Sequence, residues 1–109
     1  MQMIRSIVRP DKVDAVKDAL GGVPVTGITV TEVRGHGQQK GHTTVYRGQE
    51  YNISLLPKMQ IETLVADDLV DAAVTAIIKA ARTGEIGDGR VFVTPVTASY
   101  KIRTGEREI

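Results

Sequence analysis

Two glycine-rich segments hold the residues whose types and spacing suit the binding of phosphate groups. The first, residues 35–41, follows a β-branched run and contains Lys40; the second, residues 83–90, has three glycines within six residues and ends at Arg90. Glycine lets backbone N–H groups approach phosphate oxygens closely, and a lysine or arginine supplies charge. The first segment lacks the GxxxxGK[ST] spacing of a P-loop and does not open a helix. The first could equally be a flexible hairpin root, and the second a Schellman-type helix end followed by a turn.

Basic residues near the C-terminus form a further candidate group. Lys101 and Arg103 alternate on one face of the terminal segment, and we expect Arg90 to lie nearby. Three cations that converge on a glycine-rich turn would suit a polyphosphate. The alternative is a solvated basic edge strand, because lysine commonly protects sheet edges.

Tyrosines and histidines occupy the polar segment between residues 35 and 55. Tyr46 and Tyr51 would present their hydroxyls to a modifying enzyme or a partner, or else pack on the stem of their own loop. His36 and His42 have no cysteine or clear carboxylate beside them, so surface imidazoles explain them better than a transition-metal site. No Ser–His–Asp order or pair of carboxylates stands out, and we expect no enzymatic activity.

Composition restricts the class of protein. The 109 residues fit a single domain, residues 1–109, and carry 14 Lys+Arg against 13 Asp+Glu, a net charge of +1. Such a balance argues against duplex DNA or an anionic membrane as the main partner, and a single phenylalanine argues against an aromatic platform for RNA. The chain has no cysteine, which excludes disulfides, thiolate metal sites and a cysteine nucleophile. With no apolar run of bilayer length and no signal-like N-terminus, we expect a cytoplasmic protein.

The elements that must position these residues follow from hydrophobic periodicity. Apolar residues at helical spacing predict one helix from Pro10 to residues 21–22 and a second from Asp67 or Asp68, one of them the N-cap, to residues 82–84. β-Branched or alternating segments predict strands at residues 3–8, 28–33, 58–65 and 90–96. Residues 98–103 are a short extra strand or a tail. Residues 35–55 form a long loop without apolar periodicity, and so long a loop in a small domain usually has a function.

The order strand–helix–strand occurs twice along the chain. Right-handed crossovers then build an α+β, ferredoxin-like double βαβ sandwich, an antiparallel sheet with two helices on one face. The other face of the sheet is left open, and its apolar residues need a cover. We therefore expect a homo-oligomer.

Together, these segments resemble the PII nitrogen-regulatory signal-transduction proteins. The likeness lies in the glycine-rich hairpin root, in Tyr-Arg-Gly-Gln-Glu-Tyr at residues 46–51, and in Thr-Gly-Glu-Ile-Gly-Asp-Gly-Arg-Val-Phe-Val at residues 83–93. Ile-Arg-Thr-Gly-Glu at residues 102–106 extends it. The resemblance covers essentially the whole chain, and it implies a homotrimer that binds ATP or ADP in the clefts between subunits.

The resemblance also implies roles for individual residues. Gln39 would bind a Mg²⁺ that bridges the ATP phosphates and 2-oxoglutarate, Lys58 would pair with the distal carboxylate of 2-oxoglutarate, and Tyr51 matches a tyrosine that some members have uridylylated. The residues implied in nucleotide binding are Ile7, Thr29, Gly35, Gly37, Gln38, Gln39, Leu64, Gly87, Asp88, Gly89, Arg90, Lys101 and Arg103. Those implied in 2-oxoglutarate binding are Gln39, Lys40, Gly41 and Lys58.

The long loop, about residues 37–55, would by this resemblance act on an ammonium transporter or a nitrogen-metabolism enzyme. It would contact no nucleic acid, and it would reach a membrane only through a transporter. The chain departs from the usual pattern at Gln38, where a basic residue is common, and at Gln49. An alternative within the same fold is a divergent PII-like adaptor that senses adenine nucleotides or another small anion without 2-oxoglutarate and regulates a linked transporter.

An enzyme of the same size class is the remaining alternative. Ferredoxin-like acylphosphatases hold phosphate in a cradle directly after their first strand. Here that position holds Arg9-Pro10-Asp11, where Pro10 has no N–H to donate and Asp11 repels phosphate. The sequence therefore favours the regulator over the acylphosphatase.

Overall fold

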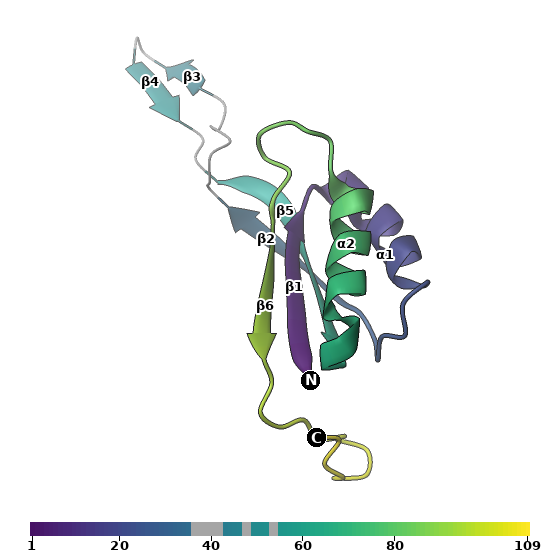
Figure 1. Cartoon of the computed structure of the whole chain (residues 1–109). Coiled ribbons are helices and arrows are strands. Elements are labelled where there is room, and N and C mark those ends of the chain that lie inside the picture. Colours follow the sequence, from purple (N-terminus) through teal and green to yellow (C-terminus); the bar gives the residue numbers. More distant parts are fainter. Residues whose placement is uncertain (36–42, 47–48, 53–54) are drawn as a thin grey trace.

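Two helices cover one face of a four-stranded antiparallel sheet (Figure 1). The computed structural model describes residues 1–35, 43–46, 49–52 and 55–109, and for residues 43–46 and 49–52 it describes the backbone alone. The strand order is β2–β5–β1–β6, and each neighbouring pair is antiparallel. The α+β, ferredoxin-like arrangement predicted from the sequence is confirmed.

The two central strands, β1 (Gln2–Val8) and β5 (Leu56–Val65), pair along the full length of β1. Alternate residues of β1, namely Ile4, Ser6 and Val8, are buried. Successive side chains of a strand point to opposite faces, so this alternation identifies the face that packs beneath the helices.

Each helix begins with a single 3₁₀ turn. α1 (Val13–Leu20) follows η1 (Pro10–Lys12), and α2 (Val70–Ala81) follows η2 (Asp67–Leu69). The buried residues of both helices join those of β1 and β5 in one hydrophobic core. Its fully buried members are Ile4, Val8, Val16, Leu20, Ile61, Val65, Ala73, Ile77 and Ala81.

The expectation that Asp67 or Asp68 caps the second helix is wrong. The residue that precedes η2 is Ala66, the residue that precedes α2 is Leu69, and neither makes a side-chain capping bond. Asp67 lies inside the 3₁₀ turn, where its carboxylate accepts hydrogen bonds from Gln2 Nε2 at 3.2 Å and from the ammonium group of Met1 at 2.9 Å. The aspartate therefore ties the start of β1 to the start of the helix.

The edges of the sheet are β2 (Thr29–Gly35) and β6 (Arg90–Pro95). Beyond the ends of β2 and β5, the chain forms a second, two-stranded antiparallel sheet of β3 (Thr43–Tyr46) and β4 (Gln49–Asn52), which projects away from the main sheet (Figure 1). The sequence predicted a loop here without regular structure, and that prediction is incomplete. The sequence of this segment has no apolar alternation, so the hydrophobic pattern does not reveal the two strands.

The C-terminal residues form a tail rather than an extra strand. After Pro95 the chain folds into a small loop, closed by an isolated bridge between Tyr100 and Arg107 and by a 2.8 Å hydrogen bond from the Lys101 N–H to the Glu106 carbonyl. Ile102 on this loop is fully exposed. Figure 1 shows the tail beyond the end of β6, away from the two-stranded sheet.

The face of the sheet opposite the helices carries both apolar and charged side chains. Phe92 of β6 is 45% exposed, and Arg5 Nη2 of β1 lies 3.2 Å from Glu62 Oε2 of β5. The predicted cover for this face, a second copy of the chain, stays a prediction. Among the described helices, none has the length and apolar character needed to cross a membrane.

Candidate functional site

The turn between α2 and β6, residues 83–89, is shaped by three glycines in the left-handed region. Gly84, Gly87 and Gly89 have φ angles of 92°, 100° and 101°, which confirms the positive φ angles expected from the sequence. α2 ends at Ala81, and the next residue, Arg82, is extended, with φ −69° and ψ 130°. A Schellman end would place a left-handed residue directly after the helix, so that alternative is wrong.

Gly89 is required by a close approach as well as by its φ angle. A Cβ atom at this position would lie 1.7 Å from the carbonyl oxygen of Ile7 and 2.8 Å from its carbonyl carbon. The turn therefore passes directly over the backbone of β1, at the point where Ile7 pairs with Arg90.

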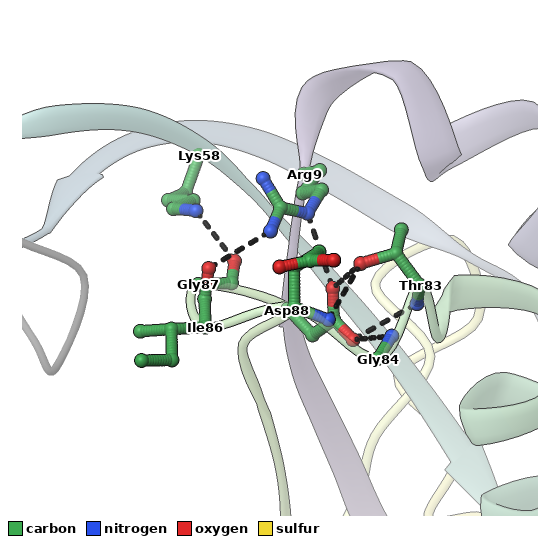
Figure 2. A network of polar contacts seen from close by, with 8 residues as sticks. Arg9, Lys58, Thr83, Gly84, Ile86, Gly87 and Asp88 are labelled. Carbon is green, nitrogen blue, oxygen red and sulfur yellow. Dashed lines mark hydrogen bonds and ion pairs between the residues drawn. The ribbon is translucent and has the colours of Figure 1, made fainter.

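The Asp88 carboxylate closes the turn from inside (Figure 2). It accepts hydrogen bonds from the N–H groups of Thr83 and Gly84, each at 2.9 Å, and from the Thr83 hydroxyl. These bonds, the one from the Thr83 hydroxyl foremost, together with Arg9, hold the pKa of Asp88 well below its usual range. The side chain thus folds the turn and stays ionised.

Two cations from the sheet hold the outer side of the turn (Figure 2). Arg9, just after β1, donates from Nε to Asp88 Oδ1 at 3.1 Å and from Nη2 to the Ile86 carbonyl at 3.0 Å. Lys58 of β5 donates from Nζ to the Gly87 carbonyl at 2.7 Å. Partial burial, and next the charge of Arg9, lower the pKa of Lys58, while Asp88 acts in the opposite sense. Three consecutive residues of the turn are therefore each bonded to a cation.

Arg9 is the residue of this network that sequence reasoning did not identify as functional. The sequence did contain one indication of its role: Arg9 directly follows the first predicted strand, which the fold places beside the turn of residues 83–89, named here the glycine turn. Lys58, in contrast, was singled out, and it does reach the turn.

The strand pairing separates the other candidate residues into two groups at opposite ends of the sheet. Gly35 pairs with Leu56 next to Lys58, and Ile7 pairs with Arg90, so these positions share the end that carries the turn. Thr29 and Leu64 lie toward the other end, since Thr29 pairs with Glu62 and Leu64 pairs with Met3.

Lys101 and Arg103 belong to the second end, and the expected convergence with Arg90 does not occur within one chain. β6 leaves the turn at Arg90 and runs beside β1 to Pro95, which at about 3.4 Å per residue is about 17 Å away. The chain then continues past the start of β1, where the Val96 N–H donates to the Met1 carbonyl at 3.1 Å. The sequence pattern could not reveal this separation, because it depends on the direction of β6.

Several predicted ligands lie outside the described residues: Gly37, Gln38, Gln39, Lys40 and Gly41. The same holds for His36 and His42, and the backbone of Tyr51 lies in β4. Among the residues that the structure does describe, no three His, Asp or Glu side chains form a group that could hold a metal ion. A Mg²⁺ ligand set built on Gln39 is therefore an expectation from the sequence.

Behind the turn lies an open cavity of about 300 Å³, on the helix side of the sheet. The second half of α2 and the start of β6 form its walls, which are mostly apolar; Arg82, Asp88 and Arg90 add polar groups. The turn thus borders an apolar hollow and is bonded to the cations Arg9 and Lys58.

A ferredoxin-like sheet, with a glycine turn locked by an aspartate and bordered by basic side chains, defines a small α+β protein with a candidate anion site. Residues 1–106 match the family model described as Nitrogen regulatory protein P-II. The Rhizobium etli "Nitrogen regulatory protein P-II" is 51% identical over 108 residues, which cover 99% of this chain and 96% of the relative. The corresponding figures are 53%, 97% and 95% for the Cereibacter sphaeroides protein of that name, and 53%, 99% and 96% for "Nitrogen regulatory protein P-II 1" of Escherichia coli.

The chain belongs to the nitrogen regulatory protein P-II family. The predicted family is confirmed by the model match and by relatives that cover nearly the whole chain. The family's members are regulators, which agrees with the expectation of a protein without catalytic machinery.

Proposed function

We propose that this protein is a non-enzymatic cytoplasmic sensor that binds ATP or ADP and 2-oxoglutarate with Mg²⁺, and controls an ammonium channel or a metabolic enzyme through its long loop. The observation that carries the proposal is the turn of residues 83–89. Its shape is set without ligand by the Asp88 carboxylate, and it is bordered by Arg9, Lys58 and Arg90. A prefolded, glycine-rich backbone beside several cations is the arrangement that recognises phosphate groups.

The nucleotide site is shared between two copies of the chain. One copy supplies the turn end of its sheet, with Ile7, Gly35 and residues 87–90. Its neighbour supplies the opposite end, with Thr29, Leu64, Lys101 and Arg103. Head-to-tail contacts between unlike ends form a ring when the rotation between copies closes, and the family resemblance implies a ring of three. The same assembly covers the open face of the sheet.

In this proposal Lys58 binds 2-oxoglutarate next to the glycine turn, residues 83–89. Its ammonium group already donates to the Gly87 carbonyl, so a carboxylate bound there lies against the same turn as the phosphates. Gln39, Lys40 and Gly41 supply the remaining contacts, and Gln39 holds the Mg²⁺ that offsets the crowded anions.

The output is a change in the long loop. β2 and β5, which lead into and out of that loop, end at Gly35 and Leu56 beside Lys58. Because the ligands bind at the root of the loop, their differential contacts can shift its conformation and so capture or release a partner.

Calorimetric titration of ATP and Mg²⁺, with and without 2-oxoglutarate, tests the proposal. We expect each ligand to tighten the other, by the same factor in both directions, as linkage requires. ATP binding that 2-oxoglutarate leaves unchanged would instead support the divergent adaptor that senses adenine nucleotides or another small anion. Absence of binding to both ATP and ADP at millimolar concentration would contradict the proposed sensor, and would leave only an adaptor that senses another small anion.

A further inference from the structure

Arg9, which lies outside the glycine turn, makes a two-point contact with it. Its guanidinium bonds to two acceptors on the turn, the Ile86 carbonyl and the Asp88 carboxylate, at 3.0 and 3.1 Å (Figure 2). A fork of donors that meets two acceptors fixes orientation as well as distance.

The backbone of Arg9 is fixed by its place in the fold. It is the extended residue, with φ −61° and ψ 143°, that joins β1 to η1, and its carbonyl accepts a 3.0 Å hydrogen bond from the Lys12 N–H. Its side chain is only 23% exposed, as is expected of a group held between elements rather than one extended into solvent. The first strand and the first helix thus hold the arginine from one side, and the turn holds it from the other.

Asp88 links Arg9 to the shape of the turn. Oδ1 of the carboxylate takes the Arg9 bond and the Thr83 hydroxyl, while Oδ2 takes the N–H groups of Thr83 and Gly84. Loss of the guanidinium would therefore release one side of the carboxylate that organises the turn, and at the same time free the Ile86 carbonyl.

We propose that Arg9 is a positioning residue for the glycine turn: it acts through Asp88 and the Ile86 carbonyl to hold the turn ready for an anion. The inference rests on the proposed function only in taking the ligand to be a phosphate. The competing role for a cation at this place is direct contact with the anion. The two roles differ in what Arg9 does to the protein before any ligand is added.

Backbone NMR of the nucleotide-free full-length protein distinguishes the two roles. The Thr83 and Gly84 amides, which donate to Asp88, report the state of the turn. In Arg9→Gln we expect the resonances of these two amides to move and their hydrogen exchange to become about tenfold faster. The reason is that the variant loses the charge-assisted hydrogen bond between Arg9 and Asp88. Arg9→Lys keeps the charge but reaches one acceptor at a time, so we expect it to restore part of the protection. Lys17→Gln removes a positive charge from the exposed side of α1 and should leave both amides unchanged.

A double-mutant cycle tests whether Arg9 acts through Asp88. We expect the exchange effects of Arg9→Gln and Asp88→Asn to be strongly non-additive, since both remove the same contact. ATP affinity should fall in Arg9→Gln by no more than the loss of protection, because it falls only with the fraction of molecules whose turn leaves the binding conformation. Thermal unfolding of each variant, followed by circular dichroism, gives the midpoint temperature of the whole protein. An unchanged midpoint temperature means that only the turn has loosened.

Two results would overturn the proposal. Weaker ATP binding with unchanged amides in the free protein would make Arg9 a direct ligand, and unchanged amides with unchanged ATP binding would leave it without a role. Should the native chain bind no nucleotide, the proposed function would fall, while the amide measurements would still decide whether Arg9 positions the turn.

Discussion

At the scale of single residues, the turn depends on Gly89 and on Asp88, each for a different reason. Gly89 combines a φ angle of 101° with backbone contact on Ile7, and Asp88 satisfies two N–H groups that the tight turn leaves without strand or helix partners. The protein's own residues therefore shape the turn before any ligand contributes.

Gly89→Ala is expected to destabilise the turn through both φ strain and collision. A left-handed non-glycine residue costs about 1–3 kcal/mol, and the added Cβ must also displace the Ile7 carbonyl, so the loss should exceed the cost of strain alone. Gly84→Ala is the matched control, because Gly84 has φ 92° and nothing within 4 Å of its Cβ. Urea denaturation of both variants measures the difference. Equal losses would mean that the contact with Ile7 has no energetic weight.

The ionisation of Asp88 gives the turn a pH dependence of known sign. Because the folded pKa lies below the value of an unfolded aspartate, about 3.8, the stabilisation is complete above about pH 4 and is lost as the pH falls through the folded pKa. Denaturant midpoints of the native chain and of Asp88→Asn should differ by a constant amount from pH 5 to 7. The gap should narrow below about pH 4, and a gap that stays constant down to pH 2 would show that the charge is irrelevant.

At the scale of elements, the sequence predicted what hydrophobic periodicity encodes and missed what it does not. The helices around Val16 and Ile77 and the buried strands around Ile4 and Ile61 were foreseen, because their apolar residues recur at periods set by the backbone. The two strands β3 and β4 were missed, since their sequence has no apolar alternation. The Asp67 cap was wrong, since the 3₁₀ turn that begins the helix already includes Asp67.

The candidate site, too, was predictable from the sequence only in part. The positive φ angles of the turn were predictable, because three closely spaced glycines have few other uses. The clamp by Arg9 was not, since it depends on the pairing of β1 with β6, which joins residues 79 positions apart. The prediction that Arg90 lies near Lys101 was wrong for the same reason, because spacing along a chain does not encode the direction in which an edge strand runs.

At the scale of the whole molecule, the proposed division of the nucleotide site between two copies predicts complementation between defective chains. A chain with Gly89→Ala keeps an intact tail, and a chain with Arg103→Ala keeps an intact turn. We expect each variant alone to lose ATP binding, and co-expressed mixtures to regain it, because every mixed trimer contains one interface with an intact turn facing an intact tail. Calorimetric stoichiometry should approach one nucleotide per mixed trimer. Mixtures that bind no better than the separate variants would place the whole site within one chain.

In the proposed shared site, the distance between the turn and the tail also makes ATP binding depend on the concentration of the protein. A ligand that draws its contacts from two chains has no complete site on a dissociated chain, so mass action makes nucleotide and subunit association favour each other. Dilution should then weaken the apparent affinity for ATP, and ATP should slow the exchange of subunits between assemblies. In the proposed shared site, the length of β6 would make a bound nucleotide a cross-link between copies, and the lifetime of the assembly would then depend on the concentration of ATP.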